Sequence, residues 1–176
     1  MHISTLKTTE YNNFYHNYIR TLGEVSLLPE LKDRKDSIVE IMNSIAEFDY
    51  GYSYAEGKWT VKQLLLHIVD TERVFQYRAF TFAREEGAML KGFEQDGYVE
   101  SSEASMRTKE SLIKEFIAVR DSTLNLFEFL PENAFENSGE VEGVAMSVKA
   151  AGFIICGHQK HHENILKDRY LPFMNV

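Results

Sequence analysis

The stretch from Gly157 to Leu171 reads "GHQKHHENILKDRYL". Three of the chain's six histidines fall within five consecutive positions of this stretch, residues 158–162. A helix turns about 100° per residue, so His158 and His162 lie about 40° apart on one face. Neighbouring apolar residues share that face, whereas His161 falls just outside it. Such i, i+4 spacing lets two imidazoles reach one metal ion, as in zinc-binding helices. The alternative for so short a motif is an exposed or hydrogen-bonded pair.

A third candidate ligand is His67, which lies in "LLLHIVDTE" with apolar residues on both sides. A buried neutral imidazole needs a partner for each ring nitrogen, and a metal ion is one good partner. If one helix supplies His67 and another supplies His158 and His162, three nitrogen ligands meet and leave one position open. Catalytic zinc sites have that arrangement. The alternative for His67 is a core histidine satisfied by hydrogen bonds.

Asp70 could orient an imidazole or a bound water, because it lies about 60° round the helix from His67. The alternative is a surface carboxylate that pairs with Arg73 or Arg78. Glu72 lies nearly opposite His67 on the same helix, which favours a structural ion pair for this residue.

Other residues near the histidines are expected to pack the core or to lie on the surface rather than to bind a metal. Cys156 points away from the face of His158 and is rejected as a ligand. Gly157 costs about 1 kcal/mol in a helix interior relative to alanine, which suggests close helix approach or room beside the site. The run 93–96 is treated as a solvated loop, with an acidic lid over the bundle mouth as the alternative. The helical projection places four residues on the solvated side: Gln159, Lys160, Glu163 and Lys167.

Apolar residues with helical periodicity predict the elements that must position these side chains. Helices are expected over residues 11–22, 29–45, 60–86, 108–130 and 147–169. Thr60 and Gln63 have the spacing of a capping box, and Ser147 is a suitable N-cap. Nothing indicates a β-hairpin. The predicted fold is all-α, a four-helix bundle with a short additional N-terminal helix, in a single domain over residues 1–176.

The composition excludes some classes of partner. A net charge of −8 and a pI near 5.3 disfavour nucleic acid, because phosphate binding depends on clustered Lys and Arg. One cysteine, a start unlike a signal peptide and no long apolar run predict a cytoplasmic protein with no membrane partner. The helix over 60–86 is apolar nearly all round, which places it centrally or at a subunit interface and predicts a homodimer.

With these residues in view, the chain resembles the DinB/YfiT-like superfamily. Three stretches carry the resemblance, in the expected order and spacing: "GKWTVKQLLLHIVDTERVFQYRA", "KGFEQDGYV" and "GHQKHHENILKDRYL". The resemblance implies a four-helix bundle whose histidine triad holds a divalent metal, commonly zinc or nickel, and often a homodimer. The positions that match this triad are His67, His158 and His162, which the helical projection also selects.

Relatives in this superfamily include enzymes that use low-molecular-weight thiols and proteins described only as metal-dependent hydrolases. We therefore expect a metal-dependent enzyme that activates a thiol or a water, acting on a small molecule. Thiol transfer is favoured over hydrolysis by family analogy alone. Asp70 is the expected supporting residue, and no general base is assigned. The alternative is a non-catalytic metal-binding or stress-related protein in which the histidine cluster staples helices together.

Overall fold

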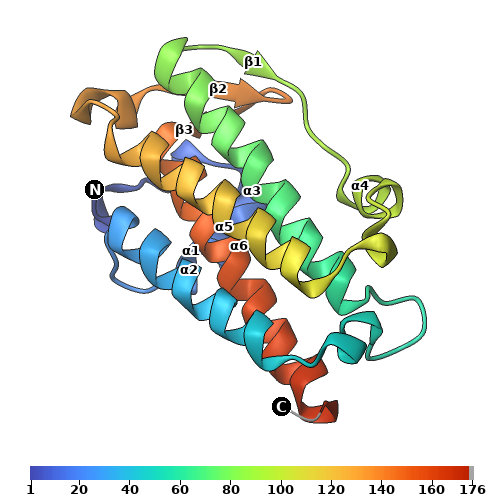
Figure 1. Ribbon diagram of the computed structural model, residues 1–176. Coiled ribbons are helices and arrows are strands. Elements are labelled where there is room, and N and C mark those ends of the chain that lie inside the picture. Colours follow the sequence, from blue (N-terminus) through green and yellow to red (C-terminus); the bar gives the residue numbers. More distant parts are fainter. Residues whose placement is uncertain (175–176) are drawn as a thin grey trace.

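Four long helices form the body of the molecule, whose computed structural model describes residues 1–174 (Figure 1). They are α2 (Leu27–Ser44), α3 (Val61–Arg84), α5 (Lys109–Glu128) and α6 (Val148–Ile165). A short helix, α1 (His16–Arg20), precedes them. The structure confirms the predicted four-helix bundle with a short N-terminal helix. No helix among residues 1–174 is both long enough and apolar enough to cross a membrane.

Side-chain caps fix where these helices begin. The Thr60 hydroxyl accepts a hydrogen bond from the Gln63 amide, and the Gln63 side chain accepts one from Thr60, which is the predicted capping box. Thr108 and Ser147 cap α5 and α6 in the same way, through the amides three residues on. These caps fix the start of α3 and α6, and hence the register of the histidines they carry.

The central helix is α6, which packs against α1, α2 and α3. All its residues from Val148 to Gln159 are buried, glycines included.

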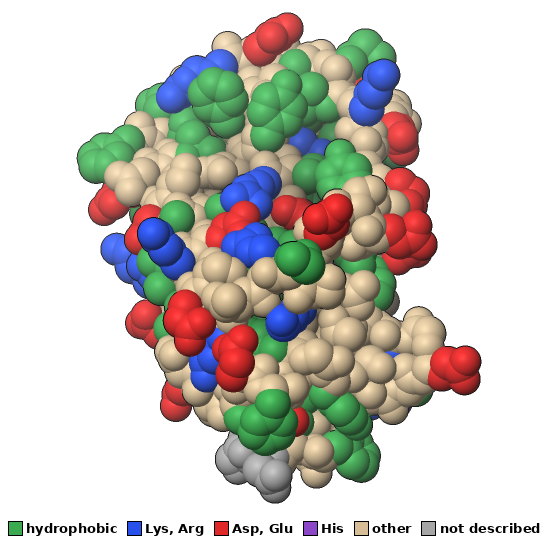
Figure 2. All heavy atoms as spheres, turned by 45° about the vertical axis from the view of Figure 1, so that its right-hand side comes forward, with side chains coloured by type: hydrophobic (Ala, Val, Ile, Leu, Met, Phe, Trp, Pro, Cys, Tyr) green, Lys and Arg blue, Asp and Glu red, His purple; other side chains and the backbone are tan. Residues whose placement is uncertain are grey.

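The outer face of α3, in contrast, exposes two aromatic side chains, Tyr77 by 58% and Phe80 by 47%. Hydrophobic side chains gather at the upper end of the face shown in Figure 2. The homodimer stays a prediction, and light scattering would test it against the chain mass of 20.4 kDa.

The assignment of Gln159 and Glu163 to a solvated face was wrong, because both side chains are only 1% exposed. They belong to a buried polar cluster that joins all four long helices. Arg120 donates to both carboxylate oxygens of Glu72, at 2.7 and 2.8 Å, and to Gln159 at 2.5 Å. Gln159 donates to Glu163 at 2.6 Å, and Arg34 donates to Glu163 at 2.9 Å. We call these five residues the Arg120 cluster; the structural ion pair expected for Glu72 is confirmed.

The expectation that the chain lacks a hairpin was also wrong. Strands β2 (Ser138–Val141) and β3 (Val144–Ser147) pair antiparallel, and β1 (Met89–Leu90) pairs parallel with β2. The two turn residues, Glu142 and Gly143, have φ of 51° and 79°. A two-residue turn with positive φ at both positions matches the twist of a hairpin. This small sheet lies at the upper end of the bundle in Figure 1.

A further helix, α4 (Gln95–Ser101), forms in the segment that was treated as a solvated loop. Glu94 caps it by accepting hydrogen bonds from the amides of Asp96 and Gly97. The helix packs against α3, so the acidic run lies against the bundle near its middle. The side chains of Glu94, Gln95 and Asp96 are exposed, as expected for a solvated segment, and the lid stays a prediction.

Candidate metal centre

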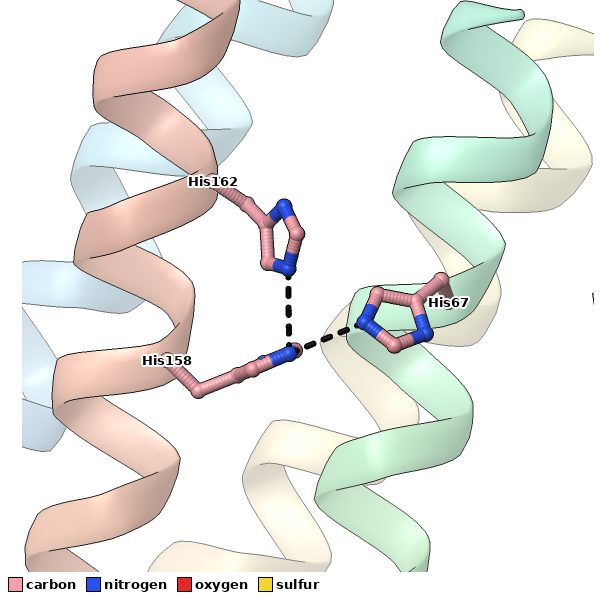
Figure 3. A group of neighbouring side chains, drawn as sticks. All are labelled: His67, His158 and His162. Carbon is pink, nitrogen blue, oxygen red and sulfur yellow. Dashed lines mark hydrogen bonds between the residues drawn. The ribbon is translucent and has the colours of Figure 1, made fainter. Parts of the chain in front are cut away.

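Three imidazoles converge between the two helices that carry them (Figure 3). His67 comes from α3, and His158 and His162 come from successive turns of α6. The Nε2 atom of His158 lies 2.9 Å from Nε2 of His67 and 3.1 Å from Nε2 of His162. One nitrogen of each ring lies within 4.8 Å of the other two. The rings are 2%, 6% and 8% exposed, so the cluster is inside the bundle.

Burial keeps these rings neutral, which is the form that binds metal. Burial, with a smaller contribution from His161, lowers the pKa of His67 from 6.5 to about 4. Burial also lowers the pKa values of His158 and His162 well below 6.5, and the neighbouring histidines act in the same direction. At neutral pH each ring therefore offers a lone pair rather than a second N–H.

The spacing of the nitrogens fits a divalent ion. Zinc–nitrogen bonds of 2.0–2.1 Å place two ligands of a tetrahedral ion about 3.3 Å apart. The two short Nε2 separations are close to that value. Without a metal these two contacts are hydrogen bonds between rings, but the single proton or lone pair on Nε2 of His158 serves one neighbour at a time, whereas a cation is a partner for all three rings. The chemistry of the donor set and its spacing thus fit a bound metal.

The N-terminal segment closes one side of the cluster. A Cβ at Gly157 would collide with the carbonyl oxygen of Tyr18, so only glycine lets α1 approach α6 this closely. This confirms the close approach expected for Gly157. The Tyr18 ring packs edge-on against His158, with 5.6 Å between ring centroids. On the other side, the Trp59 ring lies 4.7 Å from His67. The imidazoles are therefore held by aromatic packing as well as by their helices.

Two neighbours of the triad stay outside it, as expected. His161 is partly exposed and packs beside the Tyr18 ring, 4.9 Å between centroids, rather than into the cluster. Cys156 is fully buried in the apolar core, and burial raises the pKa of its thiol. A thiol held protonated in that position is neither a metal ligand nor a nucleophile at neutral pH.

Asp70 lies one turn beyond His67 and pairs with Arg73, whose Nη1 is 3.3 Å from its carboxylate. Arg73 also binds Glu115 at 2.6 Å, so both acids share one cation. Burial raises the pKa of Asp70, although Arg73 opposes that shift. No hydrogen bond within residues 1–174 joins Asp70 to an imidazole. The role of Asp70 in orienting a ligand stays a prediction.

Two cavities reach the triad from different sides. The first, of about 200 Å³, is lined by His158 together with aromatic residues, among them Tyr18 and Phe75. The second, of about 270 Å³, is lined by His162, Trp59 and Tyr170. Residues at the start of α4 line both cavities: the N-cap Glu94 and Gln95 line the first, and Asp96 lines the second.

Thr71 is a site residue that the sequence did not single out. It follows His67 by four residues, so it lies on the same face of α3, and it lines the first cavity. Its side chain is 2% exposed, and its hydroxyl has no hydrogen-bond partner among the described residues. The i, i+4 relation to His67 was the only signal in the sequence. An unpaired buried hydroxyl beside a cavity can serve a ligand.

Known proteins share this fold. YfiT of Bacillus subtilis, described as a probable metal-dependent hydrolase with an unusual four-helix bundle topology, superposes with a TM-score of 0.74. It is 12% identical, and the match covers 95% of this chain and 91% of that one. The DinB-like protein YjoA of Bacillus subtilis has a TM-score of 0.60 at 15% identity, over 85% and 95% of the two chains.

Sequence comparisons agree with the structural ones. A protein of Oceanobacillus iheyensis named "Putative metal-dependent hydrolase OB0413" is 22% identical over 137 residues, covering 77% of this chain and 78% of its own. The model of the DinB superfamily matches residues 30–166. This range contains most of α2, all of α3, α5 and α6, and the three clustered histidines. With this match over most of its length, the chain belongs to the DinB superfamily.

Proposed function

We propose that this protein is a metal-dependent enzyme that activates a small nucleophile at His67, His158 and His162. The observation that carries the proposal is the convergence of three neutral imidazoles at a point that two cavities reach. A closed structural site would have a fourth protein ligand, whereas three nitrogens leave a position for a reactant. The group of possible ligands within residues 1–174 contains these three residues alone.

A divalent ion, zinc or nickel by family analogy, would keep its full charge on three neutral imidazoles and lower the pKa of a water or thiol bound beside them. The chain's own residues supply the rest. Helices α3 and α6 fix the imidazoles, and aromatic side chains, among them Tyr18 and Phe75, line the cavity at His158. The Thr71 hydroxyl offers a hydrogen bond inside the cavity. Asp70, one turn beyond His67, is the proposed positioning carboxylate.

Hydrolysis is the reaction that the names of similar proteins support, since two of them are described as metal-dependent hydrolases. Thiol transfer is the second candidate, and a different observation favours it. Hydrolysis needs a pocket for only one organic substrate, because its second reactant is water. The triad borders two cavities, one on the His158 side and one on the His162 side. A thiol in one cavity and its electrophilic acceptor in the other would use both.

Turnover by metal-loaded protein tests the proposal. Purified protein loaded with zinc or nickel would be assayed with nitrophenyl esters for hydrolysis, and with cysteine and chlorodinitrobenzene for thiol transfer. We expect one of these activities in the wild type and in His161→Ala, and background rates in His162→Ala. Activity that persists in His162→Ala at equal fold content would refute a reaction at the triad.

The competing hypothesis is a non-catalytic protein in which the bound metal only holds the helices together. The bundle already buries an extensive apolar core and the Arg120 cluster without using the triad. We therefore expect chelation to leave the helical circular dichroism unchanged and to lower the melting temperature only by the mass-action contribution of a lost ligand. Unfolding on chelation would support the staple instead.

A further inference from the structure

Arg78 is a buried cation that forms no ion pair with any residue that the structure describes. Its side chain is only 2% exposed and comes from the last two turns of α3. The guanidinium sits against the rings of Phe75 and Phe93, at 4.7 and 5.7 Å from their centroids. Its Nη2 donates one long hydrogen bond, 3.5 Å, to the carbonyl of Lys91. Its Nη1 is buried and has no acceptor within the described residues.

The second buried arginine shows what a structural role requires. Arg120 donates to both oxygens of Glu72 and to two further acceptors. Among residues 1–174 no carboxylate lies within 4.0 Å of the Arg78 guanidinium. A buried charge without a counterion is costly, and aromatic contacts offset only part of that cost. An anion that arrives from solution would complete the pairing.

A cavity gives such an anion access to Arg78. Arg78 lines a space of about 130 Å³ together with Asn12, Tyr15 and Phe93. Tyr15 and Phe93 also line the aromatic cavity that reaches His158, so the two spaces adjoin. A ligand whose charged end meets the guanidinium could therefore extend its apolar body toward the triad.

The face of α3 supports the same path. At 100° per residue, Thr71 lies about 40° and Arg78 about 20° from His67, so all three lie on one face. At 1.5 Å per residue, Arg78 is about 16 Å along the axis from His67. Among residues 1–174, the Thr71 hydroxyl and Nη1 of Arg78 have no hydrogen-bond partner, and both follow the histidine along one side of α3.

We propose that Arg78 binds the carboxylate of the substrate, whose apolar body fills the aromatic cavity between Phe75, Phe93 and His158. The planar guanidinium fork matches a carboxylate with two parallel hydrogen bonds. Glu142 lines the same cavity, so it repels any anion that enters, but it repels a doubly charged phosphate about twice as strongly as a singly charged carboxylate. The assignment rests on the proposed function for what happens at the triad, but the binding itself needs only Arg78.

Calorimetric titration with phenylpropionate tests the assignment, with phenylpropionamide as the neutral match and phenethyl phosphate as the dianionic one. We expect the carboxylate to bind the wild type most tightly of the three. Arg78→Met should weaken it about 10- to 100-fold, since a hydrogen-bonded charge is lost. Arg84→Met, which removes an exposed arginine of the same helix, should leave binding unchanged.

The triad variant separates this assignment from the proposed function. His162→Ala should keep phenylpropionate binding even though its bound metal is lost. Binding that disappears in His162→Ala but persists in Arg78→Met would place the carboxylate at the triad, and would overturn the assignment while leaving the metal function standing. Equal binding of the amide, or tighter binding of the phosphate, would also overturn it.

Stability provides a readout that does not depend on any ligand. Removing an uncompensated buried charge should raise the melting temperature of Arg78→Met above that of the wild type. A fall in melting temperature would mark Arg78 as a structural residue and overturn the assignment. Arg78→Lys keeps the charge in place but not the fork, so it should bind phenylpropionate more weakly than the wild type at unchanged fold.

Discussion

Two polar clusters lie side by side in the same apolar bundle, and adjacent residues of α6 supply both. His158 and His162 point into the triad, whereas Gln159 and Glu163 point into the Arg120 cluster. In the Arg120 cluster every charge has an oppositely charged partner, because Arg120 pairs with Glu72 and Arg34 pairs with Glu163.

The triad differs in that its groups are alike. Three neutral imidazoles face one another, the nearby Thr71 hydroxyl is unpaired, and so is Nδ1 of His162, within the described residues. Both clusters are buried, but only the Arg120 cluster pairs each of its charges with an opposite charge. A polar cluster whose charges pair with one another stabilises the fold, while one that leaves lone pairs and hydroxyls facing cavities can bind something from solution.

Metal content should separate the clusters most sharply. His162→Ala removes one of three ligands, so bound zinc or nickel should fall from about one ion per chain to near zero. His161→Ala, one residue away and outside the triad, should keep its metal. Plasma emission spectroscopy of the purified variants measures both. Equal loss in the two variants would contradict the assignment of the triad.

The Arg120 cluster should respond in stability instead. Glu72→Ala leaves the buried Arg120 charge without its carboxylate, so the free energy of unfolding should fall by about 3–5 kcal/mol. Urea denaturation followed by circular dichroism gives this value. A loss below about 1 kcal/mol would mean that the cluster contributes little to the fold, and the contrast with the triad would disappear.

Acid should weaken the metal-free protein through the triad. An unfolded histidine titrates near 6.5, but burial lowers the pKa of His67 to about 4 in the folded chain. As the pH falls below 6.5, the unfolded state takes up the proton first, so the free energy of unfolding decreases until about pH 4. Each unit of pKa difference corresponds to about 1.4 kcal/mol, which gives about 3 kcal/mol for His67.

Urea titrations of chelated protein across that pH range measure this loss. His67→Gln removes the titrating group, so its stability should depend less on pH over the same interval. If the wild type and His67→Gln lose stability in parallel, the loss comes from other groups.

The smallest effect is expected at Asp70. If its carboxylate orients an imidazole or a bound water, Asp70→Asn should weaken metal binding about 10- to 100-fold without unfolding the protein. Asp121→Asn, which changes a carboxylate paired with Lys35 far along α5, is the matched control. Competition with a chelator of known affinity measures both variants. Unchanged affinity in Asp70→Asn would leave Asp70 as the ion-pair partner of Arg73 alone.

Helical periodicity was sufficient to find the bundle and the inward histidines, because apolar residues mark the same face as His158 and His162. It failed for Gln159 and Glu163, since a projection treats polar residues as solvated and cannot see that α2 and α5 cover that side with Arg34 and Arg120. Burial on all sides of α6 follows from tertiary packing alone.

The hairpin was missed for a local reason. Strands β2 and β3 have four residues each, too few for alternation to stand out, and the signal was confined to the Glu142–Gly143 turn. Thr71 and Arg78 were missed because lacking a partner is a property of the folded surroundings. The sequence shows only that a threonine and an arginine share a helix face with His67.

The contact of Gly157 with the Tyr18 backbone has a consequence for how this site can diversify. The DinB superfamily match begins at residue 30 and includes all three histidines, but Tyr15 and Tyr18 precede it. Part of the wall of the His158 cavity thus comes from a segment outside the range that the superfamily model matches. Substitutions at Tyr15 or Tyr18 would therefore reshape the entrance to the His158 cavity without altering any of the three imidazoles.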